Sequence, residues 1–181
     1  VGYLGRKRHS STAPTPLASE LLVSLFLSRH TYIHTQQTQT NNNTMGETKN
    51  TQKLTKAELD HKLKLAAPDR HILEDLAVVC AKDPSPDNTF QYAFCLSKST
   101  EPSELRYAVS ILDGLVKEGY EHQLDCMYGA ACALYLLGEY EKARYRCEQI
   151  LRSHPESRLA AELHLASIES KDQQDAKAVK D

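Results

Sequence analysis

The sequence of 181 residues predicts an all-α fold. Between residues 68 and 171, apolar side chains recur at offsets of three, four and seven positions, which places them on one face of a helix. Proline or glycine interrupts this pattern at intervals that match the length of ordinary helices. No segment alternates polar and apolar residues over the length of a strand, so we expect no β-sheet.

The composition predicts one domain with a hydrophobic core, since 40% of the residues are hydrophobic and 25% are charged. Residues 45–181 hold 18 basic and 23 acidic side chains, a net charge of −5. This excess of acidic groups argues against nucleic acid as a partner, because nucleic-acid-binding domains carry a basic surface. No apolar run approaches the roughly 20 residues of a membrane span, so we expect the chain as given to be soluble.

The first 44 residues differ in composition from the rest of the chain. They combine a basic start, clusters of Ser, Thr and Pro, and a polar tract of Thr, Gln and Asn, which cannot bury enough apolar surface to fold. We expect residues 1–44 to be a disordered or non-native extension before Met45. A mitochondrial targeting segment, which shares the basic and Ser-rich character, is an alternative. Residues 45–67, polar with isolated leucines, are expected to form an arm or a marginal helix.

Two helices are expected first after Pro68. Apolar positions from Ile72 onward form a stripe that ends at residue 82, before Asp83 and Pro84. The next helix begins with Ser85 as its N-cap and Pro86 at its first position, a combination that helix starts favour. It is predicted to run to about residue 99.

Four more helices are expected before a charged tail. Glycine ends the third helix at Gly119 and precedes the fifth at Gly138, because glycine adopts the left-handed conformation that commonly follows a helix. Pro155 closes the fifth helix. The predicted ranges are 102–119, 120–137, 138–155 and 156–170, and residues 172–181 are expected to fray.

An internal repeat organises these helices. The segment Gly138-x-Tyr140-x-x-Ala143, followed by Pro155, resembles the second helix of a tetratricopeptide repeat. Aligning Ala108 with Ala143 gives a spacing of 35 residues, close to the period of about 34 of such repeats. We therefore predict a six-helix array over residues 68–171, in which two tetratricopeptide-like helix pairs, residues 89–120 and 124–155, are covered at each end by a capping helix.

No motif in the sequence indicates catalysis, a cofactor or a metal site, so we expect neither an enzyme nor a small-molecule substrate. His30 and His34 have a spacing of four but no further ligand nearby. A thiol-dependent enzyme that uses Cys126 or Cys132 is the remaining enzymatic alternative. The odd number of cysteines and the absence of a C-x-x-C motif instead predict reduced, buried thiols at Cys80, Cys95, Cys126, Cys132 and Cys147.

A protein-binding groove is the expected functional surface, because stacked helix pairs present the first helix of each pair along an inner wall. This wall is predicted to be apolar and aromatic. A clamp for a terminal carboxylate is disfavoured, since the chain has no Asn after Asn88. The residues predicted to line the groove are Phe90, Ala93, Phe94, Ser97, Tyr128, Cys132 and Tyr135.

Three segments carry a family resemblance. Residues 87–96, Asp-Asn-Thr-Phe-Gln-Tyr-Ala-Phe-Cys-Leu, are similar to the signature N-T-x-F-x-Y-A-W-C-L of the mitochondrial fission 1 family. Residues 112–116 and 138–144 match the third and fifth helices of the same family. The resemblance covers about residues 72–171 and implies six helices with two tetratricopeptide-like repeats.

The resemblance also implies a function. The family consists of tail-anchored adaptors of the mitochondrial outer membrane, displayed to the cytosol and found on peroxisomes too, that recruit a dynamin-related GTPase directly or through an adaptor. A segment before the first family helix can fold over the groove, which implies a removable lid at residues 45–67. A soluble tetratricopeptide scaffold in chaperone or complex assembly is the alternative function, and homo-oligomerisation stays open.

Three departures from the family pattern stand out. Phe94 replaces the usual Trp, a change that keeps the bulk. Leu134 replaces a polar Asn of the vertebrate pattern and is expected to change the polarity of the groove. The chain stops at Asp181 after a charged run, so the apolar membrane anchor of the family is expected to be either truncated or absent.

Overall fold

The structure is a computed structural model that describes residues 45–180, with side chains from residue 48 onward. The predictions for residues 1–44, including the extension, the targeting segment and the pair His30 and His34, lie outside the described residues. The described part contains seven helices and no strand, so the predicted all-α class is confirmed. The helices are α2 (Met45–Leu65), α3 (Arg70–Lys82), α4 (Pro86–Leu96), α5 (Pro102–Lys117), α6 (Gln123–Leu136), α7 (Tyr140–Ser153) and α8 (Arg158–Ala178).

The start of α4 follows from its sequence. The Ser85 side chain accepts a hydrogen bond from the Asn88 backbone N–H at 3.3 Å, which satisfies one of the donors that a helix start leaves unpaired. Pro86 supplies a fixed φ where no backbone donor is needed. Asp87 lies in the first turn, where its charge interacts favourably with the helix dipole.

Two glycines end α5 and α6 in the same way. Gly119 and Gly138 have φ values of 78° and 76°, a conformation that other residues adopt only with strain. In each turn the next residue donates its N–H to a carbonyl five positions back: Tyr120 to Leu115, and Glu139 to Leu134, both at 3.0 Å. These bonds satisfy the last carbonyls of each helix and turn the chain back for the next one.

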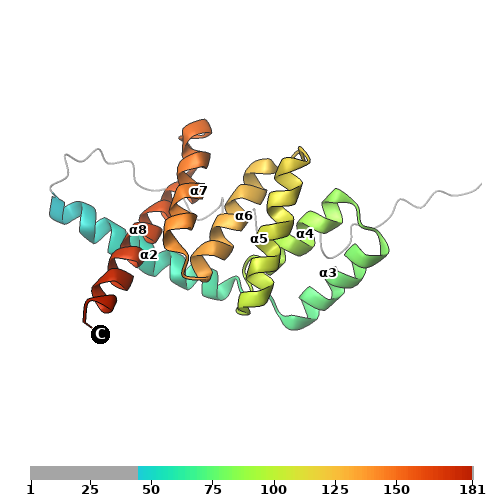
Figure 1. Cartoon of the computed structure of the whole chain (residues 1–181), viewed down its shortest axis with the longest axis horizontal. Coiled ribbons are helices and arrows are strands. Elements are labelled where there is room, and N and C mark those ends of the chain that lie inside the picture. The colour runs from blue at the N-terminus through green and yellow to red at the C-terminus, as the bar shows by residue number, and fades with distance from the viewer. Residues whose placement is uncertain (1–44, 181) are drawn as a thin grey trace, which may run out of the picture. The chain divides into compact units, whose positions relative to one another are not determined.

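The helices pack as two successive pairs, α4 with α5 and α6 with α7 (Figure 1). The first helices of the two pairs also touch, since α4 contacts α6, and α6 in turn contacts α8. We call α4, α6 and α8 the inner wall. The outer helices α5 and α7 each pack on α6. This is the arrangement predicted from the 35-residue repeat, with α3 and α8 as the end helices.

The central helix α6 is buried on nearly all sides because small residues let its neighbours approach closely. Nine of its 14 residues are buried, among them Gly129. A Cβ atom at Gly129 would lie 3.0 Å from Leu112 Cδ1 of α5 and 3.0 Å from Phe94 Cδ2 of α4. Gly129 therefore sets how closely α4 and α5 pack on α6.

The ends of the described chain bear on two sequence-based expectations. Of the two forms expected for the segment before α3, an arm or a marginal helix, the structure shows the helix: α2 has 21 residues and packs along α8. The tail does not fray at residue 171, since α8 continues to Ala178. Ion pairs and hydrogen bonds four residues apart support this extension, including Lys171 with Asp175 at 2.5 Å. The domain boundaries themselves stay a prediction.

Gly129→Val is expected to destabilise the fold by about 1–3 kcal/mol, because the added methyl groups overpack against Phe94 and Leu112. The matched variant is Gly114→Ala on α5, where a Cβ would meet nothing within 4 Å. That change should stabilise the fold by about 0.5–1 kcal/mol, because alanine favours the helical conformation. Urea unfolding followed by circular dichroism measures both values, and equal effects of the two variants would contradict the close packing at Gly129.

Candidate functional site

The seven residues predicted to line the groove all lie in the core. The most exposed of them is Tyr128, at 9% of its full surface, and Ala93, Ser97 and Cys132 are at 0%. In the described conformation these side chains therefore fill space between helices rather than an open surface. That they bind a partner stays a prediction, which requires a neighbouring element to move.

Four of the seven form one group on α4 and its C-terminal turn. The rings of Phe90 and Phe94 lie 5.3 Å apart between centroids. The Ser97 hydroxyl donates a hydrogen bond to the Phe94 carbonyl oxygen at 2.7 Å, and Ala93 is fully buried. Phe90 also stacks on His122 before α6, with ring centroids 5.9 Å apart. This group fixes α4 against the start of α6.

Lys98 also belongs to this group, although it was not among the residues predicted from the sequence. The residue is only 4% exposed, and its Nζ donates hydrogen bonds to the Phe94 carbonyl oxygen at 3.0 Å and to Ser97 Oγ at 3.2 Å. The same nitrogen lies 3.5 Å from the centroid of the Phe94 ring, which is a cation–π contact. Burial lowers the pKa of Lys98 to about 8, against an opposing influence of Cys132, Cys95 and Asp125. The spacing of four between Phe94 and Lys98 is the signal that the sequence offers.

The other three residues lie on α6 in a different cluster. Tyr128, Cys132 and Tyr135 share a hydrophobic core cluster with residues of α7 and α8 and with Leu59 and Leu63 of α2. Burial raises the pKa of the Tyr128 hydroxyl and of the Cys132 thiol, so both groups stay neutral near neutral pH. The structure thus divides the predicted groove into an α4 group and an α6 group.

Tyr135 links the inner wall to α2. Its hydroxyl donates a hydrogen bond to Asp60 Oδ1 of α2 at 2.7 Å and lies 3.0 Å from Ser170 Oγ of α8. Burial raises the pKa of Tyr135, so the hydroxyl keeps its proton and remains a donor. One side chain therefore connects α2, α6 and α8.

The contact between α2 and α8 also includes ion pairs. Lys62 Nζ pairs with Glu162 Oε2 at 3.0 Å, and Lys49 pairs with Asp172 and, at 3.8 Å, with Glu169. Glu169 is only 3% exposed because α2 lies over this face of α8.

Gln52 is the weak point of this polar contact. Its side chain is only 8% exposed, and its Oε1 has no hydrogen-bond partner among the residues that the structure describes. A buried carbonyl without a partner costs about 1–3 kcal/mol, so this contact is less favourable than its area suggests.

The two thiols of the enzymatic alternative are poor nucleophiles. Cys126 and Cys132 are both at 0% exposure. Burial, with a further influence of Asp125, raises the pKa of Cys126 to about 12. A reactive cysteine needs an accessible thiolate, which neither thiol provides.

Lys98→Met is expected to stabilise the fold near neutral pH, because folding no longer buries a charged ammonium group. A pKa lowered from 10.5 to about 8 corresponds to a cost on the order of 3 kcal/mol. This cost is fully present below pH 8 and is lost as the pH rises from about 8 to 10.5, because the neutral amine is then favoured in the unfolded chain too. Urea unfolding at several pH values should show an advantage of the variant that shrinks above pH 8.

The matched control is Lys117→Met on the exposed surface of α5. It removes a positive charge that is exposed rather than buried. The free energy of unfolding of this variant should therefore differ little from that of the natural chain and should not follow this pH profile. A Lys98→Met variant that is less stable than the natural chain at pH 7 would show that the cation–π contact and the two hydrogen bonds outweigh the cost of burial.

Known proteins are similar to this chain over part of its length. No family model matches the chain. The mitochondrial fission 1 protein of Debaryomyces hansenii is 30% identical over 99 residues, which cover 55% of this chain and 65% of that protein. The human mitochondrial fission 1 protein is 34% identical over 80 residues, which cover 44% of this chain and 53% of that protein. The chain thus spans less than two thirds of the length of these relatives.

Solved structures show the same fold. The crystal structure of fission protein Fis1 from Saccharomyces cerevisiae matches with a TM-score of 0.58 at 24% identity, over 65% of this chain and 95% of that chain. Yeast Fis1 in complex with an Mdv1 fragment, which contains N-terminal extension and coiled coil domains, matches with a TM-score of 0.56 at 27% identity, over 63% and 94% of the two chains. Together these likenesses confirm the predicted resemblance of the helical domain to the mitochondrial fission 1 family.

Proposed function

We propose that the chain is a non-enzymatic adaptor in mitochondrial fission that binds a dynamin-related GTPase, or an adaptor of that GTPase, through its helical domain. The observation that carries this proposal is the likeness to yeast Fis1 in complex with an Mdv1 fragment, which extends over 94% of that chain. In the proposal the domain faces the cytosol at the mitochondrial outer membrane, with peroxisomes as a second location. None of the helices within residues 45–180 is long and apolar enough to cross a membrane.

We further propose that the inner wall receives the partner after α2 leaves it. In the described conformation α2 packs along α8, and its Asp60 accepts the hydrogen bond of Tyr135. Leu59 and Leu63 complete the cluster that contains Tyr128, Cys132 and Tyr135. Release of α2 would uncover that part of the inner wall.

The contacts of α2 support its role as a removable element. Among its described side chains only Gln52, Leu59 and Leu63 are buried, whereas α6 buries nine residues. Burying a leucine side chain contributes about 1.5–3 kcal/mol, and ordering the backbone costs about 1–2 kcal/mol per residue. Since an isolated helix of this length is marginal in water, α2 is held far less strongly than α6.

A substitution in α2 tests this proposal better than one in the wall itself. Ala93 and Tyr135 are buried in the core, so Ala93→Arg or Tyr135→Ala would change folding together with any binding. Leu63 is also buried, but it belongs to α2. The contacts of the helices α3 to α8 with one another do not involve it.

Leu63→Glu is expected to increase the affinity for the partner about tenfold or more, because a buried carboxylate favours release of α2 and the partner no longer competes with it. The measurement is isothermal titration of the full chain with the Mdv1 fragment and, separately, with a purified dynamin-related GTPase. Unfolding of the variant should remain cooperative, since α3 to α8 keep their contacts.

The control is Leu65→Glu, the same change two residues away at a position that is 74% exposed. It should leave the affinity unchanged. Equal affinities of Leu63→Glu and the natural chain would reject α2 as a lid, and failure of every variant to bind either protein would reject the adaptor role.

A further inference from the structure

The charges of α2 and α8 are complementary where the two helices meet. Between residues 48 and 65, α2 carries five lysines and two acidic residues, a net charge of +3. Its lysines pair with three carboxylates of α8, those of Glu162, Glu169 and Asp172. The positive charge of α2 therefore helps to hold this helix on α8.

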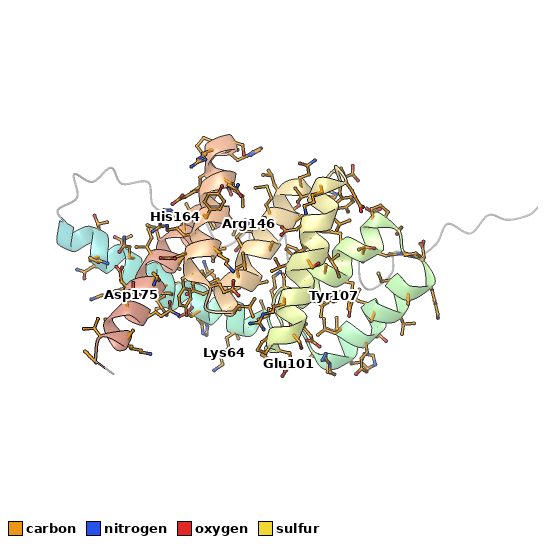
Figure 2. The ribbon with its side chains drawn as sticks, viewed as in Figure 1. Lys64, Glu101, Tyr107, Arg146, His164 and Asp175 are labelled. Carbon is orange, nitrogen blue, oxygen red and sulfur yellow. The ribbon has the colours of Figure 1, made fainter. Side chains whose placement is uncertain are left out.

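Thr55 lies on α2 at the edge of this contact. It comes three residues after Gln52 and four before Leu59, so the three side chains share one face of the helix. Gln52 and Leu59 are buried, whereas Thr55 is half-buried. The Thr55 side chain is thus at the margin of the face that α2 buries. Lys64 of α2 and Asp175 of α8 mark the two helices in Figure 2.

The residues that follow Thr55 match the recognition pattern of acidophilic protein kinases. These kinases phosphorylate a Ser or Thr that has an acidic residue three positions further on, and Glu58 holds that position. Glu58 is exposed, so its carboxylate is accessible to a kinase. Because the pattern is short, the helix that carries it decides whether a kinase can use it.

Two other hydroxyls in the described part of the chain precede an acid at the same spacing, Ser110 before Asp113 and Ser153 before Glu156. Ser110 lies within α5, and the Ser153 hydroxyl is hydrogen-bonded to a carbonyl of α7. Both helices pack on α6, whereas α2 buries only three of its described side chains. A kinase must bring the hydroxyl into line with the γ-phosphate, which requires a docked helix to open. Opening favours Thr55 over the other two hydroxyls.

We propose that Thr55 is a phosphorylation site and that its phosphate keeps α2 away from α8. This inference rests on the proposed role of α2 as a removable element. An acidophilic kinase transfers the γ-phosphoryl group of a nucleoside triphosphate to Thr55 Oγ1. The O–H bond of the threonine and the bond between the γ-phosphorus and its bridging oxygen break, and a new P–O bond forms at Oγ1. The proton and the nucleoside diphosphate leave.

The phosphate opposes the docking of α2 through its charge. Near pH 7 it carries a charge of about −1.5 to −2, which lowers the net charge of α2 from +3 to about +1. It stands one turn from the buried Gln52, on a helix that faces the carboxylates of α8. Repulsion by these carboxylates and the loss of hydration of the phosphate both favour the released helix.

Hydrogen exchange of the full chain with phosphothreonine at position 55 tests the release of α2. Amide exchange in α2 should be about tenfold faster or more than in the natural chain, because exchange follows the population of the opened helix. Exchange in α6 should stay the same. The control carries phosphoserine at the exposed Ser110 of α5, which adds the same charge away from α2 and should leave the exchange of α2 unchanged.

Treatment of the full chain with casein kinase 2, an acidophilic kinase, and ATP tests the site. Mass spectrometry of proteolytic fragments should locate the phosphate at Thr55. Glu58→Gln should be phosphorylated about tenfold more slowly, because the kinase loses a charge-assisted contact. The matched control is Thr51→Ala, one turn earlier on α2, which should be phosphorylated at the natural rate because residue 54 is a leucine.

Three results would overturn the proposal. Phosphorylation at Ser110 or Ser153 in place of Thr55 would reject the site. Exchange of α2 that is equal to, or slower than, that of the natural chain would reject release by the phosphate. Leu63→Glu in the same assay separates the two hypotheses, since no partner is present. Faster exchange in this variant without an effect of the phosphate rejects the switch alone, and no effect of either change rejects α2 as a removable element.

Discussion

The close approach of α4 and α5 to α6 at Gly129 is the constraint on which the fold depends. A Cβ atom at this position would lie only 3.0 Å from Leu112 and from Phe94, so a side chain fits there only if one of these neighbours shifts. Because α6 also contacts α7 and α8, it becomes the rigid centre of the domain. The two pairs are held in register by this helix, and the glycine turns at Gly119 and Gly138 deliver the chain to it and away from it.

The helices α3 to α8 could be predicted because each carries a local signal. The N-cap Ser85 with Pro86 and the glycine stops mark helix ends through backbone chemistry that does not depend on the rest of the fold. The helix α2 could not be predicted with the same success, because only Leu59 and Leu63 form its buried apolar face. Its stability comes from contact with α8, which no local pattern reveals.

The candidate site was harder to predict than the fold. Helical periodicity identifies an apolar face, but α6 is buried on nearly every face, so spacing could not separate its residues that face α2 and α8 from those that face α5 and α7. Leu134 and Tyr135 show this, since Leu134 lines a cavity together with residues of α5 and α7, whereas the adjacent Tyr135 donates a hydrogen bond to Asp60 of α2. Lys98 was overlooked because a lysine at the end of a helix is normally exposed, whereas this one lies over the Phe94 ring.

Adjacent residues in the last turn of α6 face different helices. Its last turn carries Leu134 toward α5 and α7 and Tyr135 toward α2 and α8. That turn is fixed by the hydrogen bonds of Gly138 to Tyr135 and of Glu139 to Leu134, both at 3.0 Å. Departure of α2 removes one hydrogen bond from Tyr135 but none from this backbone turn. The last turn of α6 therefore keeps its backbone hydrogen bonds when the inner wall is uncovered.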